Sequence, residues 1–368
     1  MAPERIQFFL PGPAYVREDV RQALTGPVMG HRSAGFQEIY QRLEEGLPQL
    51  FRTSGDVFMA SSSATLVMEA AVVSTVQKRV LNLTSGAFSE RWHEVCQLHG
   101  LEADRVAVPW GRAVDPELVR AALRRNSSGR GQYEAVTLVH NETSTGVVNP
   151  VEEISRVVRE ESDALLLVDC VSSLGGAPFE TDAWGVDIAL AGVQKAMALP
   201  PGLVLFTLSE RAARQAESVP RRGFYTDVLR YRDRHRGHGP ITTPVVSLVY
   251  ALDFQLRRLL DEGVEERWQR HRRMQQQTLE WAEARNFGCA AEAGARSWTV
   301  TCLRPPSSSS TPLSAPQWVA QLAERGYTVA SGYGQWKGET FRIGHMGDVQ
   351  PADLEALFAV MDQILESS

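Results

Sequence analysis

Residues 164–195 read ALLLVDCVSSLGGAPFETDAWGVDIALAGVQK, and this stretch decides the fold class. It contains two short, unbroken apolar runs: one ends at Asp169, and the other is followed by Gln194 and Lys195. Such runs are typical of strands that are covered on both faces, as in parallel sheets. The stretch therefore predicts two buried strands, each with a polar or charged side chain at its carboxyl end.

The surrounding sequence repeats this alternation of strand and helix. Further strands are predicted over residues 56–60, 79–83, 104–109, 134–140 and 203–208, and helices over residues 65–77, 88–99, 116–125 and 151–161. Strands separated by helices of about 10–15 residues indicate βαβ units. We therefore expect an α/β fold in which helices flank a mostly parallel, seven-stranded sheet.

The pattern changes after residue 210. An arginine-rich loop is predicted over residues 221–239, followed by long helices over 245–260 and 264–285. Shorter elements follow, with strands at 297–303, 327–330 and 340–343 and helices at 315–325 and 351–365. This mixture predicts a small α+β unit at the C-terminal end.

The composition excludes several classes of protein. Hydrophobic residues make up 43% and charged residues 22%, as in an ordinary soluble globular protein. The net charge of −6 argues against a general nucleic-acid binder. The four cysteines (Cys96, Cys170, Cys289 and Cys302) are widely spaced, which favours a reducing compartment over a disulfide framework or a zinc ribbon.

Targeting signals are also missing from the sequence pattern. No apolar run approaches the roughly 18 residues of a membrane span. The apolar part of MAPERIQFFLPGP, at the N-terminus, is too short for a signal peptide. We therefore expect a cytoplasmic protein.

In an open α/β sheet, ligands bind outside the carboxyl ends of the strands, so the residues that follow the predicted strands are candidates for a site. Residues 61–65 (SSSAT) open a helix, where they either serve as a plain cap or hold an anion at the helix N-terminus. Phe88 follows the next strand and either stacks on a flat ligand or packs on its own helix, and the local sequence favours packing. Residues 140–146 (HNETSTG) form a dense polar cluster after a buried strand.

A carboxylate and an amine follow the two strands of the opening stretch. Asp169 at the end of a buried strand needs a partner, either a structural arginine or a cationic nitrogen of a ligand. The chain has only three lysines (Lys78, Lys195 and Lys337), and Lys195 alone has apolar surroundings. A lysine in such surroundings can have its pKa lowered and attack an aldehyde.

Together these strand ends offer an anion site, hydroxyl groups, a carboxylate and an amine. This combination suits pyridoxal 5'-phosphate, whose phosphate, ring nitrogen and aldehyde need an anion site, an acid and a lysine respectively. The sequence therefore predicts a cofactor that joins the groups around Asp169 and Lys195.

Eight segments, in a fixed order over nearly the whole chain, carry a family resemblance. They are residues 10–13 (LPGP), 30–33 (GHRS), 61–65, 142–146 (ETSTG), 168–176, 192–195 (GVQK), 242–244 (TTP) and 341–344 (FRIG). On these segments the sequence resembles the class V aminotransferases among the fold-type I pyridoxal-phosphate enzymes. It is most similar to the alanine/serine–glyoxylate (serine–pyruvate) group and to small bacterial relatives labelled aspartate aminotransferases.

The resemblance implies a role for each matching residue. Lys195 would form the Schiff base with the cofactor, and Asp169 would pair with the pyridine nitrogen. Phe88 would lie over the ring, which overturns the local packing interpretation. The remaining cofactor contacts would be Ser63, Ala64, Thr65 and Gln194 at the phosphate and Thr143 at the ring hydroxyl.

The resemblance also implies substrate and subunit contacts. Arg342 would clamp the substrate α-carboxylate, while Gly12 and His31 would shape the mouth of the site. The active sites would lie at the interface of a homodimer, where Thr242 or Thr243 would reach the phosphate of the other subunit. A large cofactor-binding domain would span residues 16–250 and a small domain residues 251–368, with residues 1–15 packing on the small domain.

Two departures from the family pattern concern the phosphate. The family's phosphate-binding turn is usually richer in glycine, whereas this chain has Ser62 and Ala64 there. A tyrosine that is common near the Thr-Pro element has no clear match, and Gly239 falls at about that place.

The predicted reaction moves an amino group from a small amino acid (alanine, serine or aspartate) to a 2-oxo acid (glyoxylate, pyruvate or 2-oxoglutarate). A cysteine desulfurase is the alternative on the same fold, and it would need a mobile thiol. Cys302 lies in a predicted strand, which leaves Cys289, in a predicted loop, as the candidate.

A nucleic-acid binder is the alternative from another class, because arginines and aromatic residues mix around residues 221–239. Acidic residues interrupt these runs, which favours an active-site flap instead. His235 and His238 form a spaced pair that we interpret as surface residues, so no metal is expected.

Overall fold

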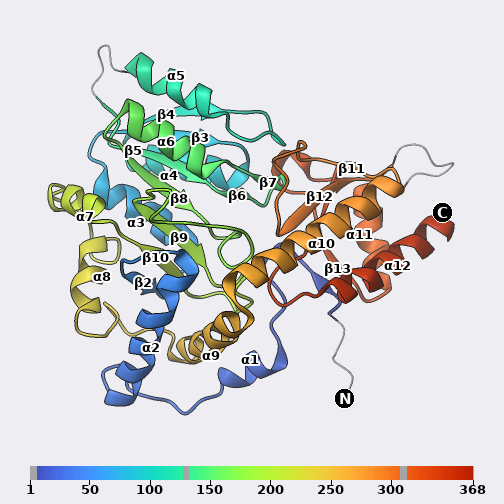
Figure 1. The fold of residues 1–368 in the computed structure, drawn as a ribbon, viewed down its shortest axis with the longest axis horizontal. Helices are drawn as coiled ribbons and strands as arrows, with labels where there is room; N and C mark the ends of the chain where they lie inside the picture. The colour runs from blue at the N-terminus through green and yellow to red at the C-terminus, as the bar shows by residue number, and fades with distance from the viewer. Residues whose placement is uncertain (1–5, 127–131, 307–312, 368) are drawn as a thin grey trace.

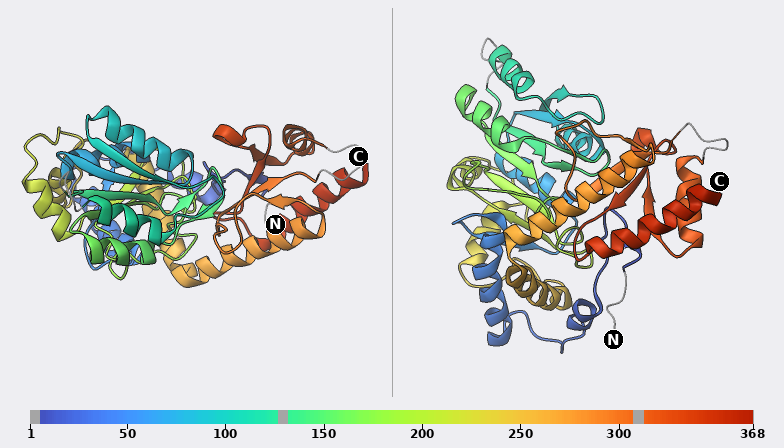
Figure 2. Two further views of the ribbon diagram at one scale, coloured as in Figure 1. Left: turned by 90° about the horizontal axis from the view of Figure 1, so that it is seen from above. Right: turned by 45° about the vertical axis from the view of Figure 1, so that its right-hand side comes forward.

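The computed structural model describes residues 6–126, 132–306 and 313–367, which form two lobes (Figure 1; Figure 2, left). The larger lobe is built around a seven-stranded sheet with the order β2-β10-β9-β8-β5-β3-β4. All neighbouring strands run parallel except that β10 is antiparallel to both β2 and β9. The strands are β2 (Val57–Ala60), β3 (Arg79–Thr84), β4 (Glu102–Ala107), β5 (Ala135–Val139), β8 (Leu165–Asp169), β9 (Ile188–Gly192) and β10 (Val204–Thr207). The prediction of a mostly parallel, seven-stranded sheet is confirmed.

Both faces of this sheet are covered, which explains the unbroken apolar runs. In β8, Leu166 and Val168 pack into one core, and Leu165 and Leu167 pack into the core on the other face. Side chains of a strand alternate between its faces, so a strand between two cores needs apolar residues at every position. The flanking helices are α2 (Ala34–Phe51), α3 (Ala64–Thr75), α4 (Ala87–Leu98), α5 (Pro116–Asn126), α6 (Val151–Glu161), α7 (Glu210–Glu217) and α8 (Val228–His235).

The smaller lobe contains a five-stranded sheet with the order β1-β13-β14-β12-β11. Its N-terminal strand β1 pairs in parallel with β13, so the chain starts in the lobe where it also finishes (Figure 1). The elements are β1 (Phe8–Phe9), β11 (Gly288–Cys289), β12 (Val300–Arg304), β13 (Thr328–Ser331), β14 (Phe341–Gly344), α11 (Ala315–Glu324) and α12 (Pro351–Ser367).

Two helices join the lobes. The apolar face of α9 (Val246–Glu262) packs in the core of the large lobe as far as Leu259. Helix α10 (Val264–Ala284) begins at the same core with Trp268 and ends in the core of the small lobe with Trp281 (Figure 2, left). The expected domain division at residue 250 falls inside α9, and it stays a prediction.

Several local predictions were wrong or incomplete. The arginine-rich loop contains α8, because Asp227 caps this helix by accepting a hydrogen bond from the N–H of Leu229 and because apolar residues between the arginines pack on the sheet. His235, interpreted as a surface residue, is buried beside Tyr40 and Phe58. The helices α1 (Glu18–Ala23) and α2 and the short strands β1, β6 (Asn141–Glu142) and β7 (Val147–Val148) were not anticipated, and Cys289 lies in β11 rather than in a loop.

Among the described residues, no helix combines the length and apolarity that crossing a membrane requires.

Candidate active site

The candidate site lies where the carboxyl ends of β8 and β9 meet. The two strands are parallel neighbours, and Asp169 ends β8 opposite Leu190 of β9. Lys195 follows β9 within one turn, so the topology brings the predicted acid and amine to one edge of the sheet.

Asp169 is a buried carboxyl group that forms no ion pair with any residue that the structure describes. It is 4% exposed, and its Oδ1 accepts a hydrogen bond from the N–H of Val171 at 2.7 Å. Burial raises its pKa to about 7; the Val171 N–H opposes this rise, and the charge of Glu142 adds to it. Its other oxygen, Oδ2, accepts no hydrogen bond from the residues that the structure describes. A cationic group placed there would restore the ionised form.

Lys195 is the complementary case of a poorly solvated amine. Its Nζ donates to the carbonyl oxygen of Pro11 at 2.7 Å. Burial lowers its pKa to about 8, and the charge of Arg342 lowers it further against the opposing effect of Asp169. Within the described ranges, no ion pair joins Lys195 to Asp169, although each shifts the pKa of the other. The two groups are therefore close enough to act on each other electrostatically, but they do not neutralise each other.

Gly12 borders this amine. A Cβ at this position would lie 2.2 Å from Cδ of Lys195, and the φ of +112° is one that residues with a side chain rarely adopt. The N–H of Ala14 also donates to the carbonyl of Gln194 at 2.8 Å. The segment that follows β1 thus runs along the turn of residues 193–197 that carries Lys195, here called the lysine turn. It leaves space for the lysine side chain only because residue 12 is glycine.

The N-terminus of α3 is a candidate anion site. Ser63 precedes the helix in an extended conformation, and its hydroxyl does not cap the helix. The side chains of Ser63, Thr65 and Gln194 make no hydrogen bond to any described residue, so they are available to a ligand. No residue of this turn has a positive φ, so glycine is not required there, and Ser62 and Ala64 are compatible with the turn.

This turn is tied to distant segments through Ser61. Its carbonyl accepts a hydrogen bond from the hydroxyl of Tyr225 at 2.8 Å, and its Oγ accepts from the N–H of Val245 at 3.0 Å. These contacts hold the turn in place, and they leave the hydroxyl groups of Ser63 and Thr65 free.

Arg342 projects from β14 toward the large lobe. Its Nε donates to the carbonyl of Ser331 at 3.0 Å, and its Nη1 donates to the carbonyl of Thr143 at 3.2 Å. The Thr143 hydroxyl makes no hydrogen bond within the described part of the chain. The guanidinium lies 5.4 Å from the ring centroid of Tyr333, and this ring stacks on Phe88 at 5.5 Å.

Glu142 fixes the position of Phe88, a role that the sequence did not reveal. This fully buried carboxylate accepts hydrogen bonds from the N–H groups of Phe88 and Ser89, at the start of α4, and from the hydroxyl of Ser144 at 2.6 Å. A Cβ on Gly86 would lie 2.5 Å from Cγ of Glu142, so glycine is needed for this approach. An anion at a helix N-terminus is favourable, and here it orients the first turn of α4.

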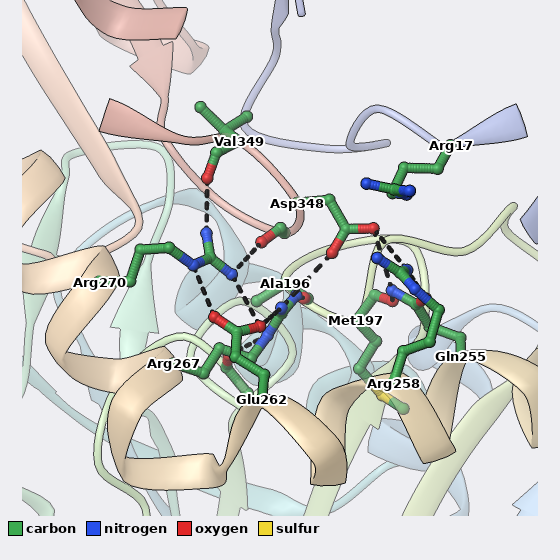
Figure 3. Close-up of polar contacts among 12 residues, drawn as sticks. Arg17, Ala196, Met197, Gln255, Arg258, Glu262, Arg267, Arg270, Asp348 and Val349 are labelled. Atoms are coloured by element: carbon green, nitrogen blue, oxygen red, sulfur yellow. Dashed lines mark hydrogen bonds and ion pairs between the residues drawn. The ribbon is translucent and has the colours of Figure 1, made fainter. Parts of the chain in front are cut away.

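A buried arginine cluster, formed by Arg267 and Arg270 with Glu262 and Asp348, supports the lysine turn (Figure 3). Arg267 of α10 is 1% exposed, and it donates to the carbonyls of Ala196 at 2.6 Å and Gly175 at 3.0 Å. Its charge is balanced by Glu262 at 2.6 Å and Asp348 at 3.4 Å. Ala196 directly follows the lysine, so the cluster holds the backbone that carries Lys195.

The same cluster reaches the segment that follows Arg342 (Figure 3). Arg270 donates to the carbonyls of Gly347 at 3.0 Å and Val349 at 2.5 Å. Gln255 of α9 bridges the carbonyl of Met197, at 3.0 Å, and the carboxylate of Asp348, at 3.3 Å. The cluster therefore connects the lysine turn of the large lobe with the small lobe.

Three predicted site residues lie apart from this group. His31 and Thr242 line a separate hollow of about 290 Å³ together with His238. Thr243 is exposed. No contact among the described residues joins these three side chains to Lys195 or Asp169.

Sequence reasoning missed Glu142, Tyr333, Arg91 and Arg267 as members of the site. For Arg91 a signal existed, because it lies three residues after Phe88 on a predicted helix and so shares its face. Glu142 lies in the polar cluster that follows a predicted strand, but no role was assigned to it. Tyr333 and Arg267 come from segments that the sequence pattern does not connect with the strand ends.

Comparisons with known proteins agree on one family. The family described as "Aminotransferase class-V" matches residues 24–301. An uncharacterized aminotransferase of Methanocaldococcus jannaschii is 36% identical over 97% of this chain and 92% of its own length. A protein named as the small subunit of a soluble hydrogenase, from Synechococcus sp., is 32% identical over 98% of this chain and 93% of its own length. The crystal structure of an alanine–glyoxylate aminotransferase from Nostoc sp. superposes with a TM-score of 0.89 at 28% identity, covering 99% of this chain and 96% of that one.

Proposed function

Because the chain belongs to the class V aminotransferases and has the fold-type I architecture, we propose that it is a transaminase that holds pyridoxal 5'-phosphate at Lys195. One observation carries this proposal: at the carboxyl ends of two neighbouring parallel strands, a carboxyl group and an amine with oppositely perturbed pKa values act on each other electrostatically, yet no ion pair joins them among the described residues. A ring with an aldehyde at one end and a basic nitrogen at the other satisfies both groups at once.

The free donors at these strand ends fit the cofactor. The α3 N-terminus, with the free side chains of Ser63, Thr65 and Gln194, suits a phosphate. Ala64 would contribute its backbone N–H at the same place. The Thr143 hydroxyl is available for a ring substituent. When bound, the cofactor supplies an aldehyde and a ring that withdraws electrons from the substrate Cα.

The protein side chains supply the remaining chemistry. With its pKa lowered to about 8, Lys195 is the base that takes the proton from the substrate Cα and later returns one. Asp169 keeps the ring nitrogen protonated. Arg342 offers a planar pair of N–H donors to the substrate α-carboxylate, and Gly12 keeps the space beside the amine open.

We propose substrates of the class that related names suggest: a small amino acid as donor and a 2-oxo acid such as glyoxylate as acceptor. The Nostoc structure is named for alanine and glyoxylate. Arg342 would bind the carboxylate that all these candidates share, so it does not choose among them.

We further propose a homodimer in which Thr242 or Thr243 serves the site of the other subunit. The support is their position: Thr242 lines a surface hollow with His31, Thr243 beside it is exposed, and neither contacts its own Lys195 among the described residues.

The geometry argues against the cysteine desulfurase. Cys302 is fully buried in β12, and burial raises the pKa of its thiol to about 11. Burial also raises the pKa of Cys289 in β11. Neither sulfur is an activated, mobile nucleophile.

The test is the visible absorption of the purified protein with added pyridoxal phosphate. The wild type and a Lys337→Ala control should form a band that an amino donor bleaches and an oxo acid restores. Lys195→Ala should neither form this band nor transaminate. A colourless Lys195→Ala protein that still transaminates would overturn the role of Lys195.

A further inference from the structure

Four of the buried or half-buried arginines that the structure describes have no carboxylate within ion-pair distance: Arg91, Arg296, Arg304 and Arg342. An arginine away from water normally pairs with an anion, so each of these invites an explanation. Of these four arginines, only Arg91 and Arg342 act electrostatically on Lys195. One of them, Arg342, already has a substrate carboxylate as its proposed partner.

Arg91 belongs to the same constellation of side chains as Arg342. It projects from α4 one turn after Phe88, and its guanidinium lies 5.0 Å from the centroid of that ring. Its Nη2 lies 3.5 Å from the hydroxyl of Tyr333, at the upper limit of a hydrogen bond. Tyr333 in turn has Arg342 over its ring, so two guanidinium groups flank one tyrosine.

The donors of Arg91 are almost unused. A guanidinium has five N–H groups, and the long contact to Tyr333 engages one of them. The buried carboxylate of Glu142 is occupied by the N–H groups of α4 and the hydroxyl of Ser144. The charge of Arg91 lowers the pKa of Asp169, but no ion pair joins the two among the described residues, and the proposed partner of Asp169 is a ring nitrogen.

On the basis of the proposed function, we propose that Arg91 is a second carboxylate-binding residue and that the preferred amino donor is a dicarboxylic amino acid. Arg342 binds the α-carboxylate, and Arg91 binds the side-chain carboxylate across Tyr333. A donor with one carboxylate leaves a guanidinium of the site uncompensated, whereas a donor such as aspartate neutralises both.

The cofactor phosphate is the alternative anionic partner for Arg91 in a loaded enzyme. The two partners differ in which substrates respond to loss of Arg91. A phosphate contact would affect every donor and the cofactor affinity alike, whereas a side-chain carboxylate contact affects dicarboxylic donors more than donors with one carboxylate.

The first experiment needs no variant. Succinate and propionate are unreactive mimics with two carboxylates and one, and their binding to the holoenzyme is measured by titration calorimetry. We expect succinate to bind about tenfold tighter or more, as one additional charge-assisted hydrogen-bonded contact implies. Equal binding of the two acids overturns the proposal.

The second experiment uses Arg91→Met, with Arg105→Met as a matched control because Arg105 is exposed on the edge strand β4. In Arg91→Met, kcat/KM for aspartate should fall about 10- to 100-fold relative to kcat/KM for alanine, and the advantage of succinate should disappear. The control should keep both values. An equal loss for aspartate and alanine, or a weaker cofactor affinity in Arg91→Met, overturns the proposal.

Failure of the proposed function has a separate signature. If no visible band that depends on Lys195 forms, the transaminase site itself is wrong. If the band forms but succinate has no advantage over propionate, only the assignment of Arg91 falls.

Discussion

In the cofactor-free protein, replacing Asp169 by asparagine should raise the stability of the fold above about pH 7. In the loaded enzyme, the same substitution should abolish transamination. The carboxyl group is buried, and burial raises its pKa from 3.8 to about 7. The folded state therefore holds this proton more tightly than the unfolded chain does. The stabilisation that results is complete below about pH 4 and is lost as the pH rises through about 7.

The size of the effect follows from that shift. A change of about three pKa units corresponds to about 4 kcal/mol at most, since each unit is worth about 1.4 kcal/mol. Above about pH 7 the wild type has to bury an ionised carboxylate, whereas asparagine buries a neutral amide of the same shape. The amide oxygen can still accept the hydrogen bond from the N–H of Val171.

The assay is the difference in Tm between Asp169→Asn and wild type, measured on cofactor-free protein across this pH range. The variant should have the higher Tm above about pH 7, and its advantage should vanish near pH 4. Asp362→Asn is the control of opposite sign, because its hydrogen bond with Arg285 lowers the pKa of that carboxyl. A cofactor-free Asp169→Asn protein that melts below the wild type above pH 7 would refute the reasoning.

Two further substitutions test the support of the lysine turn. Arg267→Met should cost about 3–5 kcal/mol of stability, because it breaks a buried charge cluster and removes the donor from the carbonyls of Ala196 and Gly175. In chemical denaturation, the control Arg272→Met, which is exposed on the same helix, should show little change. A loss under about 1 kcal/mol in Arg267→Met would contradict this expectation. Gly12→Ala should slow the appearance of the visible band when pyridoxal phosphate is added, because the new Cβ would lie 2.2 Å from Cδ of Lys195. The control Gly30→Ala, whose new Cβ would meet no atom within 4 Å, should form the band at the rate of the wild type. Equal rates in the two variants would argue against steric blocking.

The large sheet could be predicted because each strand carries its own signal. Leu165–Val168 must be apolar at every position, since the strand lies between two cores, and such a run is visible in the sequence alone. The positions of Asp169 and Lys195 followed from the same logic, because parallel neighbours end at one edge of the sheet.

Elements without such a signal were missed. Strand β1 has two residues, Phe8 and Phe9, which is too short to show any periodicity. In α8 the arginines hide a buried face formed by Val228, Leu229 and Tyr231, so the segment resembled a loop.

The parts of the site that come from distant segments could not be predicted. Arg91 and Tyr333 meet across 242 positions of sequence, and Phe88 stacks on the same tyrosine. Nothing local to α4 or to the segment after β13 indicates this pairing, because it depends on how the small lobe sits against the large one. Family resemblance supplied roles only for matching positions, and Tyr333 was not among them.

The arginine cluster opposes separation of the two lobes. Lys195 belongs to the large lobe and Arg342 to the small one, so the distance between amine and carboxylate clamp depends on the arrangement of the lobes. Arg267 binds the carbonyl next to Lys195 and also Asp348, six positions after Arg342. Separating the lobes would expose these buried charges without their partners, at a cost of about 3–5 kcal/mol for a single broken pair. The spacing of Lys195 and Arg342 is therefore set by the fold before a substrate arrives, and selectivity must come from the side chains around that fixed gap, Arg91 and Tyr333 among them.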